Sequence, residues 1–234
     1  MSHIHLPDGI LPFAWWASAY IVCIAVLCIM LRLIKKGEVR RKVPFTGVMS
    51  ALMLISMSVP LGFIPIHMSL SVLNGILAGP ALGFIAVFVV NIMLSLMGHG
   101  GLSVAGLNTL LMGSEVLIGY YMFTALKRHM KPSLAAGISA LVALTVSVAL
   151  MFGVLAATIG TEEALPGHES GEHGIGKEQP ASFLSLSGWS AAAVILIIGM
   201  LTEALVTGLI VSFFSRVRPD LIDAPAVSES NRMG

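Results

Sequence analysis

Charged side chains are scarce in this chain, making up 11% of its 234 residues, whereas a typical soluble domain has about 25%. Cysteine is rarer still, with two residues, Cys23 and Cys28, inside one apolar run. Their spacing places them on different faces of a helix, so we expect core or lipid-facing side chains. The shortage of charge excludes an ordinary soluble fold.

Charge of neither sign is in excess, because 13 Lys and Arg face 12 Asp and Glu. The chain therefore lacks a basic surface for nucleic acid. Long apolar runs dominate instead, with 56% hydrophobic residues and a mean hydropathy of +0.94. They predict an all-α integral membrane protein, a bundle of about seven transmembrane helices. The expected spans are 13–34, 45–59, 68–78, 81–97, 107–126, 133–159 and 186–215.

The third of these segments, 68–78, is short and lies between Pro65 and the Gly79-Pro80 pair. It fits either a short tilted span or a re-entrant helix. Lys and Arg follow the first, fifth and seventh spans, and these loops share one side of the membrane if the third segment crosses. Cytoplasmic loops collect such cations. We therefore expect seven spans in the plasma (inner) membrane, with the N-terminus outside and the C-terminus cytoplasmic.

The whole chain reads as one membrane domain, 1–220, followed by a cytoplasmic tail, 221–234. Within the domain, 1–12 forms an N-terminal tail and 160–185 a polar outer loop. The stretch from Gly171 to Lys177 matches a phosphate-binding loop, but Glu178 replaces the Ser or Thr that binds Mg²⁺ and no strand precedes it. We expect no ATP hydrolysis by this chain.

Histidines are distributed unevenly in this topology, since His129 alone falls on the cytoplasmic side. The outer ones are His3, His5, His67, His99, His168 and His173. Imidazole is the commonest protein ligand for Zn, Cu, Ni and Co. An outward-facing transition-metal site is therefore a fair hypothesis, although any single loop histidine can be a solvated side chain.

The N-terminus suits metal chelation, because His3 is two residues from a free amine. An amine, the following amide nitrogens and an imidazole form consecutive donors, an arrangement that favours Ni(II) or Cu(II). Ser2 is small enough for Met1 to be removed, so the amine belongs to Met1 or Ser2. His67 ends the Pro- and Gly-containing connection 60–67 and either lines a site or caps the next helix.

Two acidic residues, Glu115 and Glu203, fall inside predicted spans, where an ionisable group is a functional hypothesis by default. Both are candidates for protonation. For Glu203 we expect a hydrogen bond to Asn91, Asn74 or a serine, and we favour structural locking over metal passage.

Several motifs resemble those of the CbiM/NikM family, the metal-binding S components of energy-coupling factor transporters. The N-terminal octapeptide His5 to Pro12 resembles the family signature. The resemblance continues at Val59–Leu61, His67, Gly79–Pro80, Gly100–Leu102, Asn108, Met112–Gly113, Glu203–Leu205 and Arg216–Leu221. It implies a six-helix S-component core with an extra N-terminal helix.

The resemblance also implies a function: capture of Co²⁺ or Ni²⁺ from the outer side for ATP-driven uptake, serving cobalamin biosynthesis or nickel enzymes. The implied ligands are the terminal amine, an N-terminal histidine and His67. Alignment to Pro7-Asp8-Gly9 favours His5 as the N-terminal ligand, whereas nearness to the amine favours His3. Asp8, His99 and Asn108 are expected to support the site. The metal is transported substrate, and no permanently bound cofactor is expected.

The implied partners are a transmembrane coupling component, a cytoplasmic ATPase dimer and a small accessory membrane protein. Ala136 and Ala140, one helical turn apart, could let a partner helix approach closely. Two alternatives remain. An intramembrane metalloenzyme needs a catalytic acid or base beside an open metal position, which we do not find, so we expect no enzyme. A stand-alone secondary transporter or channel would have broken helices and polar sites near the bilayer midplane.

Overall fold

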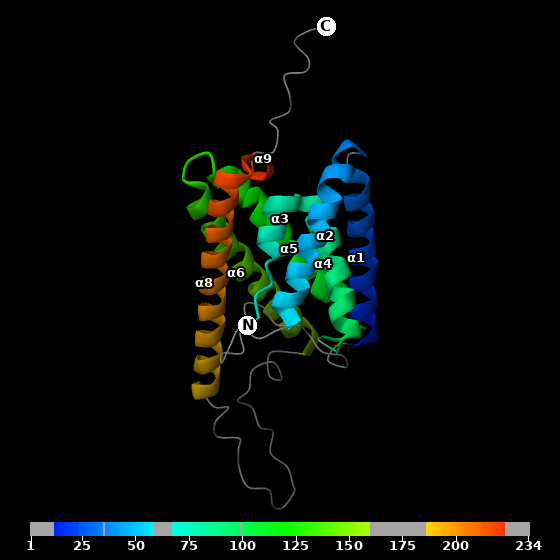
Figure 1. Cartoon of the computed structure of the whole chain (residues 1–234). Helices are drawn as coiled ribbons and strands as arrows, with labels where there is room; N and C mark the ends of the chain where they lie inside the picture. Colours follow the sequence, from blue (N-terminus) through cyan, green and yellow to red (C-terminus); the bar gives the residue numbers. More distant parts are fainter. Residues whose placement is uncertain (1–11, 35, 59–66, 99, 160–185, 223–234) are drawn as a thin grey trace, which may run out of the picture.

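The computed structural model describes residues 12–34, 36–58, 67–98, 100–159 and 186–222. These residues form a bundle of helices (Figure 1). The helices are α1 (Phe13–Leu33), α2 (Lys36–Ser58), α3 (Ser71–Ala78), α4 (Pro80–Leu96), α5 (Ala105–Leu126), α6 (Pro132–Ile159), α8 (Leu186–Val217) and the short α9 (Pro219–Ile222). A helix lies in each segment that the sequence predicted to be a span.

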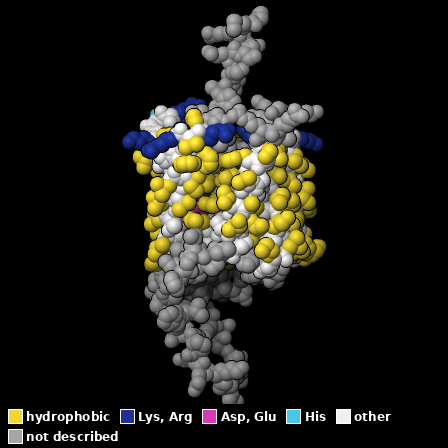
Figure 2. Space-filling model, viewed as in Figure 1, with side chains coloured by type: hydrophobic (Ala, Val, Ile, Leu, Met, Phe, Trp, Pro, Cys, Tyr) yellow, Lys and Arg dark blue, Asp and Glu magenta, His cyan; other side chains and the backbone are white. Residues whose placement is uncertain are grey.

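Four of the helices, α1, α5, α6 and α8, are long and apolar enough to cross a membrane, while the apolar part of α2 and all of α4 are shorter. Exposed Leu, Ile, Val and Phe side chains cover the sides of the bundle (Figure 2). Such a surface is stable in contact with lipid chains rather than water. The protein is therefore a multi-pass membrane protein, as predicted.

The third segment differs from the expected eleven-residue helix. Met68, Ser69 and Leu70 are not helical, and α3 begins at Ser71 because Leu70 adopts the left-handed region, with φ of 53°. Gly79, with φ of 93°, ends α3, and Pro80 begins α4 at once. With eight residues, α3 is about 12 Å long. It cannot cross a bilayer as a helix by itself.

Helix α3 occupies the centre of the bundle. All of its residues are buried, and it contacts α2, α4, α5, α6, α8 and α9. Two glycines allow this close packing against α5. A Cβ atom on Gly75 would lie 2.7 Å from the backbone oxygen of Val116, and one on Gly119 would lie 2.5 Å from Val72. Backbone and side chain thus meet without space for a methyl group.

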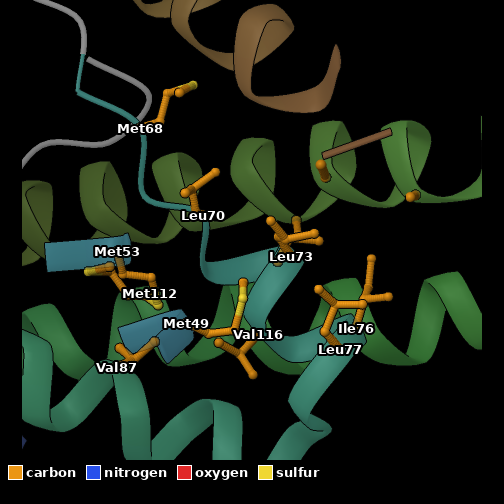
Figure 3. Packing of buried hydrophobic residues seen from close by; sticks show 14 of the residues in the cluster. Met49, Met53, Met68, Leu70, Leu73, Ile76, Leu77, Val87, Met112 and Val116 are labelled. Atoms are coloured by element: carbon orange, nitrogen blue, oxygen red, sulfur yellow. The ribbon is translucent and has the colours of Figure 1, made fainter. Parts of the chain in front are cut away.

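The apolar core around α3 is rich in methionine (Figure 3). Met49 and Met53 of α2 and Met112 of α5 belong to the same cluster as Leu73 and Val116, and all five are nearly fully buried. Unbranched thioether side chains fill irregular gaps between helices. These methionines therefore pack the core.

Helix α1 lies at the edge of the bundle, against α4 and α5. Its buried residues are Ala19 and Cys23, whereas Cys28 is exposed. Both cysteines are therefore placed as predicted. The Tyr20 hydroxyl donates a short hydrogen bond to the Leu102 carbonyl, and the Tyr20 ring lies over Gly106. This contact attaches α1 to the start of α5.

Cationic side chains gather at one end of the bundle (Figure 2). This end contains the last turn of α1, the connection between α5 and α6, and the junction of α8 with α9 (Figure 1). The cations that the structure describes there are Arg32, Lys42, Lys127, Arg128, Lys131, Arg216 and Arg218. We call it the cationic end.

The alanines proposed for partner contact are used inside the protein. Ala136 and Ala140 of α6 have no exposed surface and belong to the central core cluster. Helix α6 packs against α8, where a Cβ atom on Gly208 would lie 2.9 Å from the Ser133 oxygen. Ala136 and Ala140 are therefore packed inside this chain and leave no surface for a partner helix.

Candidate functional site

His67 is the first described residue of the non-helical segment that leads into α3. Its side chain is half-buried, while Met68, Ser69 and Leu70 are buried. The Met68 carbonyl accepts a hydrogen bond of 2.8 Å from the Ser56 hydroxyl of α2. Figure 3 shows this segment descending past Met68 and Leu70 into α3. One side of the segment is therefore fixed to α2.

Glu203 of α8 fixes the other side. Its carboxylate accepts hydrogen bonds from the Ser69 N–H at 3.0 Å, the Leu70 N–H at 2.8 Å and the Ser69 hydroxyl at 2.6 Å. The Glu203 side chain is fully buried. One side chain thus binds two consecutive backbone N–H groups. In a helix or sheet these groups would donate to backbone carbonyls instead. The expectation of a structural lock involving a serine agrees with this geometry.

The two asparagines considered for Glu203 bind elsewhere. The Asn74 amide donates to Met53 Sδ at 3.2 Å and to the Gly83 carbonyl at 3.4 Å. The Asn91 amide donates to the Thr109 hydroxyl at 3.4 Å. These bonds connect α3 with α2 and α4, and α4 with α5, so both residues stabilise helix packing.

Glu115 of α5 faces the same serine. The Ser69 hydroxyl lies 3.2 Å from Glu115 Oε2, and the Glu115 side chain is fully buried. Its second oxygen, Oε1, has no hydrogen-bond partner among the described residues. The hydroxyls of Ser71 and Ser147 are also close to this carboxyl. Two carboxyl groups from α5 and α8 therefore converge on one hydroxyl in the core.

The structure describes two of the residues that the sequence predicted for a metal site, His67 and Asn108. His67 is in the segment described above, and Asn108 is buried in the first turn of α5. Met1, Ser2, His3, His5, Asp8 and His99 lie outside the described residues, as do the outer loop 160–185 and most of the connection 60–67. Within the described ranges, no three His, Cys, Asp or Glu side chains form a group that could hold a metal ion.

Sequence reasoning identified the two buried glutamates but missed their partners, Ser69 and Leu70. Glu203 binds the backbone N–H groups of both residues, and Glu115 contacts the Ser69 hydroxyl. The signal available was weak. Ser69 and Ser71 alternate directly after His67, and polar residues next to an intramembrane carboxylate are candidates for its partners. Nothing local in the sequence indicates that Leu70 has positive φ, because leucine rarely adopts it.

The fold and this core define a class: a multi-pass helical membrane protein built around a broken, buried segment that two carboxyl groups hold. The CbiM family model, described as a cobalt uptake substrate-specific transmembrane region, matches residues 5–221. The chain belongs to this family.

Two solved structures have the same fold. One, a transition metal transporter, is 21% identical with a TM-score of 0.69, and the alignment covers 92% of this chain and 93% of the other. A truncated transition metal transporter is 20% identical with a TM-score of 0.66, covering 92% and 99% respectively. No curated protein sequence matches the chain.

Proposed function

We propose that this protein is the substrate-capture component of an ATP-driven uptake system for Co²⁺ or Ni²⁺. Its family is named for cobalt uptake, and the similar structures are described as transition metal transporters. The observation that carries the proposal is the placement of His67. This histidine directly precedes Met68, Ser69 and Leu70, which hydrogen bonds hold from two sides inside a membrane bundle. An imidazole carried by a fixed backbone segment is a suitable metal ligand.

The proposed ligands are the terminal amine, His3 or His5, and His67, with Asp8, His99 and Asn108 in support. The amine belongs to Met1 or Ser2, and the peptide and imidazole nitrogens complete a chelate that suits Ni(II); a site made of imidazoles would also suit Co(II). The metal is the transported substrate. The chain itself catalyses no reaction in this proposal.

The proposed orientation follows from the cationic end. Because Lys and Arg accumulate in cytoplasmic loops, the cationic end faces the cytoplasm and the N-terminus lies outside. The non-helical Met68–Leu70 segment and α3 together bring the chain back toward the cationic end, where α4 begins (Figure 1). A broken third span of this kind gives seven crossings.

Calorimetric titration with Ni²⁺ and Co²⁺ tests the capture step, using protein with an authentic N-terminus. We expect one-to-one binding that His67→Ala weakens by about 100-fold or more, since one ligand is lost. His3→Ala and His5→Ala identify the N-terminal ligand, and N-terminal acetylation should abolish tight binding. His129→Ala is the matched control, because His129 is exposed near the cationic end. Equal affinity in all variants would contradict the proposal.

One observation favours a second function, a stand-alone transporter. Broken helices and buried polar sites are typical of secondary transporters, and this bundle has a chain break at Leu70 and two buried glutamates, Glu115 and Glu203. Metal uptake by cells tests this alternative. Uptake that requires a coupling component and an ATPase supports the capture function, whereas uptake by this chain alone supports the second.

A further inference from the structure

We propose that Glu203 is a positioning residue for His67, and that Glu115 supports it as a neutral hydrogen-bond donor. This inference rests on the proposed metal-capture function. Glu203 binds the backbone N–H groups of the second and third residues after His67. A carboxylate 134 residues away in sequence thus determines the path of the chain that leaves the histidine.

The held backbone is one that would not persist by itself. Leu70 has φ of 53°, a left-handed conformation that is unfavourable for a residue with a Cβ atom. Such conformations persist where the surroundings fix them. Here the Leu70 N–H donates to Glu203 Oε1, and the Leu70 carbonyl accepts from the Asn74 N–H of α3 at 2.9 Å. Without the carboxylate, Ser69 and Leu70 would have two buried N–H groups unsatisfied.

The hydrogen count at Ser69 assigns different roles to the two glutamates. Its hydroxyl carries one hydrogen, and the shorter contact, 2.6 Å to Glu203, is the one that receives it. The 3.2 Å contact with Glu115 then requires a hydrogen from Glu115. Two ionised carboxylates beside one hydroxyl in an apolar core would also repel each other strongly. Glu203 is therefore the acceptor, and Glu115 is the donor.

These roles predict an asymmetry between two isosteric substitutions. Glutamine in place of a neutral glutamic acid retains a donor, so Glu115→Gln preserves the contact with Ser69. Glu203→Gln replaces one acceptor oxygen with an amide N–H₂ group, which then faces donors. The two N–H groups and the hydroxyl of Ser69 and Leu70 all donate to the two carboxylate oxygens of Glu203, one of which the substitution removes. The segment should relax only in the second variant.

The test uses the full chain with an authentic N-terminus in detergent, and Ni²⁺ as the probe. We expect Glu203→Gln to weaken Ni²⁺ binding by about tenfold or more, since a charge-assisted hydrogen-bond network is lost. The ligand-field absorption of the bound Ni²⁺ should change in the same variant, and the Ser69 and Leu70 amides should exchange faster with deuterium. Glu115→Gln should keep the wild-type spectrum, with affinity within about threefold.

Ser69→Ala provides a second variant if Glu203→Gln does not fold. It removes the hydroxyl but leaves both backbone bonds to Glu203, so we expect an intermediate loss of Ni²⁺ affinity. The positioning role would be overturned if Glu203→Gln kept the wild-type affinity and spectrum, or if Ser69→Ala did so where Glu203→Gln does not fold. Equal losses of affinity in Glu203→Gln and Glu115→Gln would overturn the assignment of the hydrogens. Failure of the wild type to bind Ni²⁺ or Co²⁺ would instead refute the proposed function itself.

Discussion

Helices α1 and α3 represent two ways of building a membrane bundle. Helix α1 is long and apolar, and most of its side chains are exposed at the edge of the protein. Helix α3 is short and fully buried, and it contacts six other elements. Length and apolarity are sufficient to place α1 in a membrane. Helix α3 also needs neighbouring helices that fit closely against all of its faces.

The comparison also separates lipid packing from protein packing. Lipid chains are about as apolar as leucine, so moving an apolar side chain from lipid into protein gains little from the hydrophobic effect. What stabilises α3 is close contact, as at Gly75, and hydrogen bonding at its ends, as at Leu70. We therefore expect substitutions around α3 to have large effects and those on the outer face of α1 to have small ones.

The largest effect is expected from filling the contact between α3 and α5. In Gly75→Val, the new Cβ atom would lie 2.7 Å from the Val116 backbone oxygen, which cannot rotate away. Overpacking costs about 1–3 kcal/mol and occasionally more. We expect the upper end of this range, with a large loss of monodisperse protein in size-exclusion chromatography. Gly153→Ala is the control, because a Cβ atom there meets no atom within 4 Å. Similar yields would show that α3 is not tightly packed.

A pair of truncations compares the two helices directly. Leu73 of α3 is 1% exposed, whereas Ile24 of α1 is 52% exposed. Leu73→Ala leaves a cavity inside the protein and should reduce the free energy of unfolding by about 2–5 kcal/mol. Lipid can fill the space left by Ile24→Ala, so its effect should be close to zero. Thermal unfolding in one detergent measures both. Equal losses would remove the distinction between the two helices.

The same distinction explains how much of the fold the sequence could predict. Apolar runs predicted every long helix, because a run and its Pro or Gly boundary are local properties. The Gly79-Pro80 boundary of α3 was visible for this reason. The start of α3 was not, since the conformation of Ser69 and Leu70 depends on Glu203 in a distant helix. Local patterns do not contain that partner.

The candidate site was predictable to a similar degree. His67, Glu115 and Glu203 were identifiable individually, because a polar residue in or beside an apolar span needs an explanation. Their relation through Ser69 required the fold. Ala136 and Ala140 show the same limit: small residues predict close packing but do not show that the packing lies inside this chain rather than at a partner.

The smallest effect is expected at the attachment of α1. Tyr20→Phe removes the hydrogen bond to the Leu102 carbonyl but keeps the ring against Gly106. One such bond contributes about 0.5–1.5 kcal/mol, so the unfolding temperature should fall slightly. Amide exchange near the start of α5 should rise, while exchange in α3 should not change. Tyr121→Phe is the control, because Tyr121 is 63% exposed. A rise in exchange throughout α3 would show that α1 and α3 unfold as one unit. The two helices would then differ in packing but not in local stability.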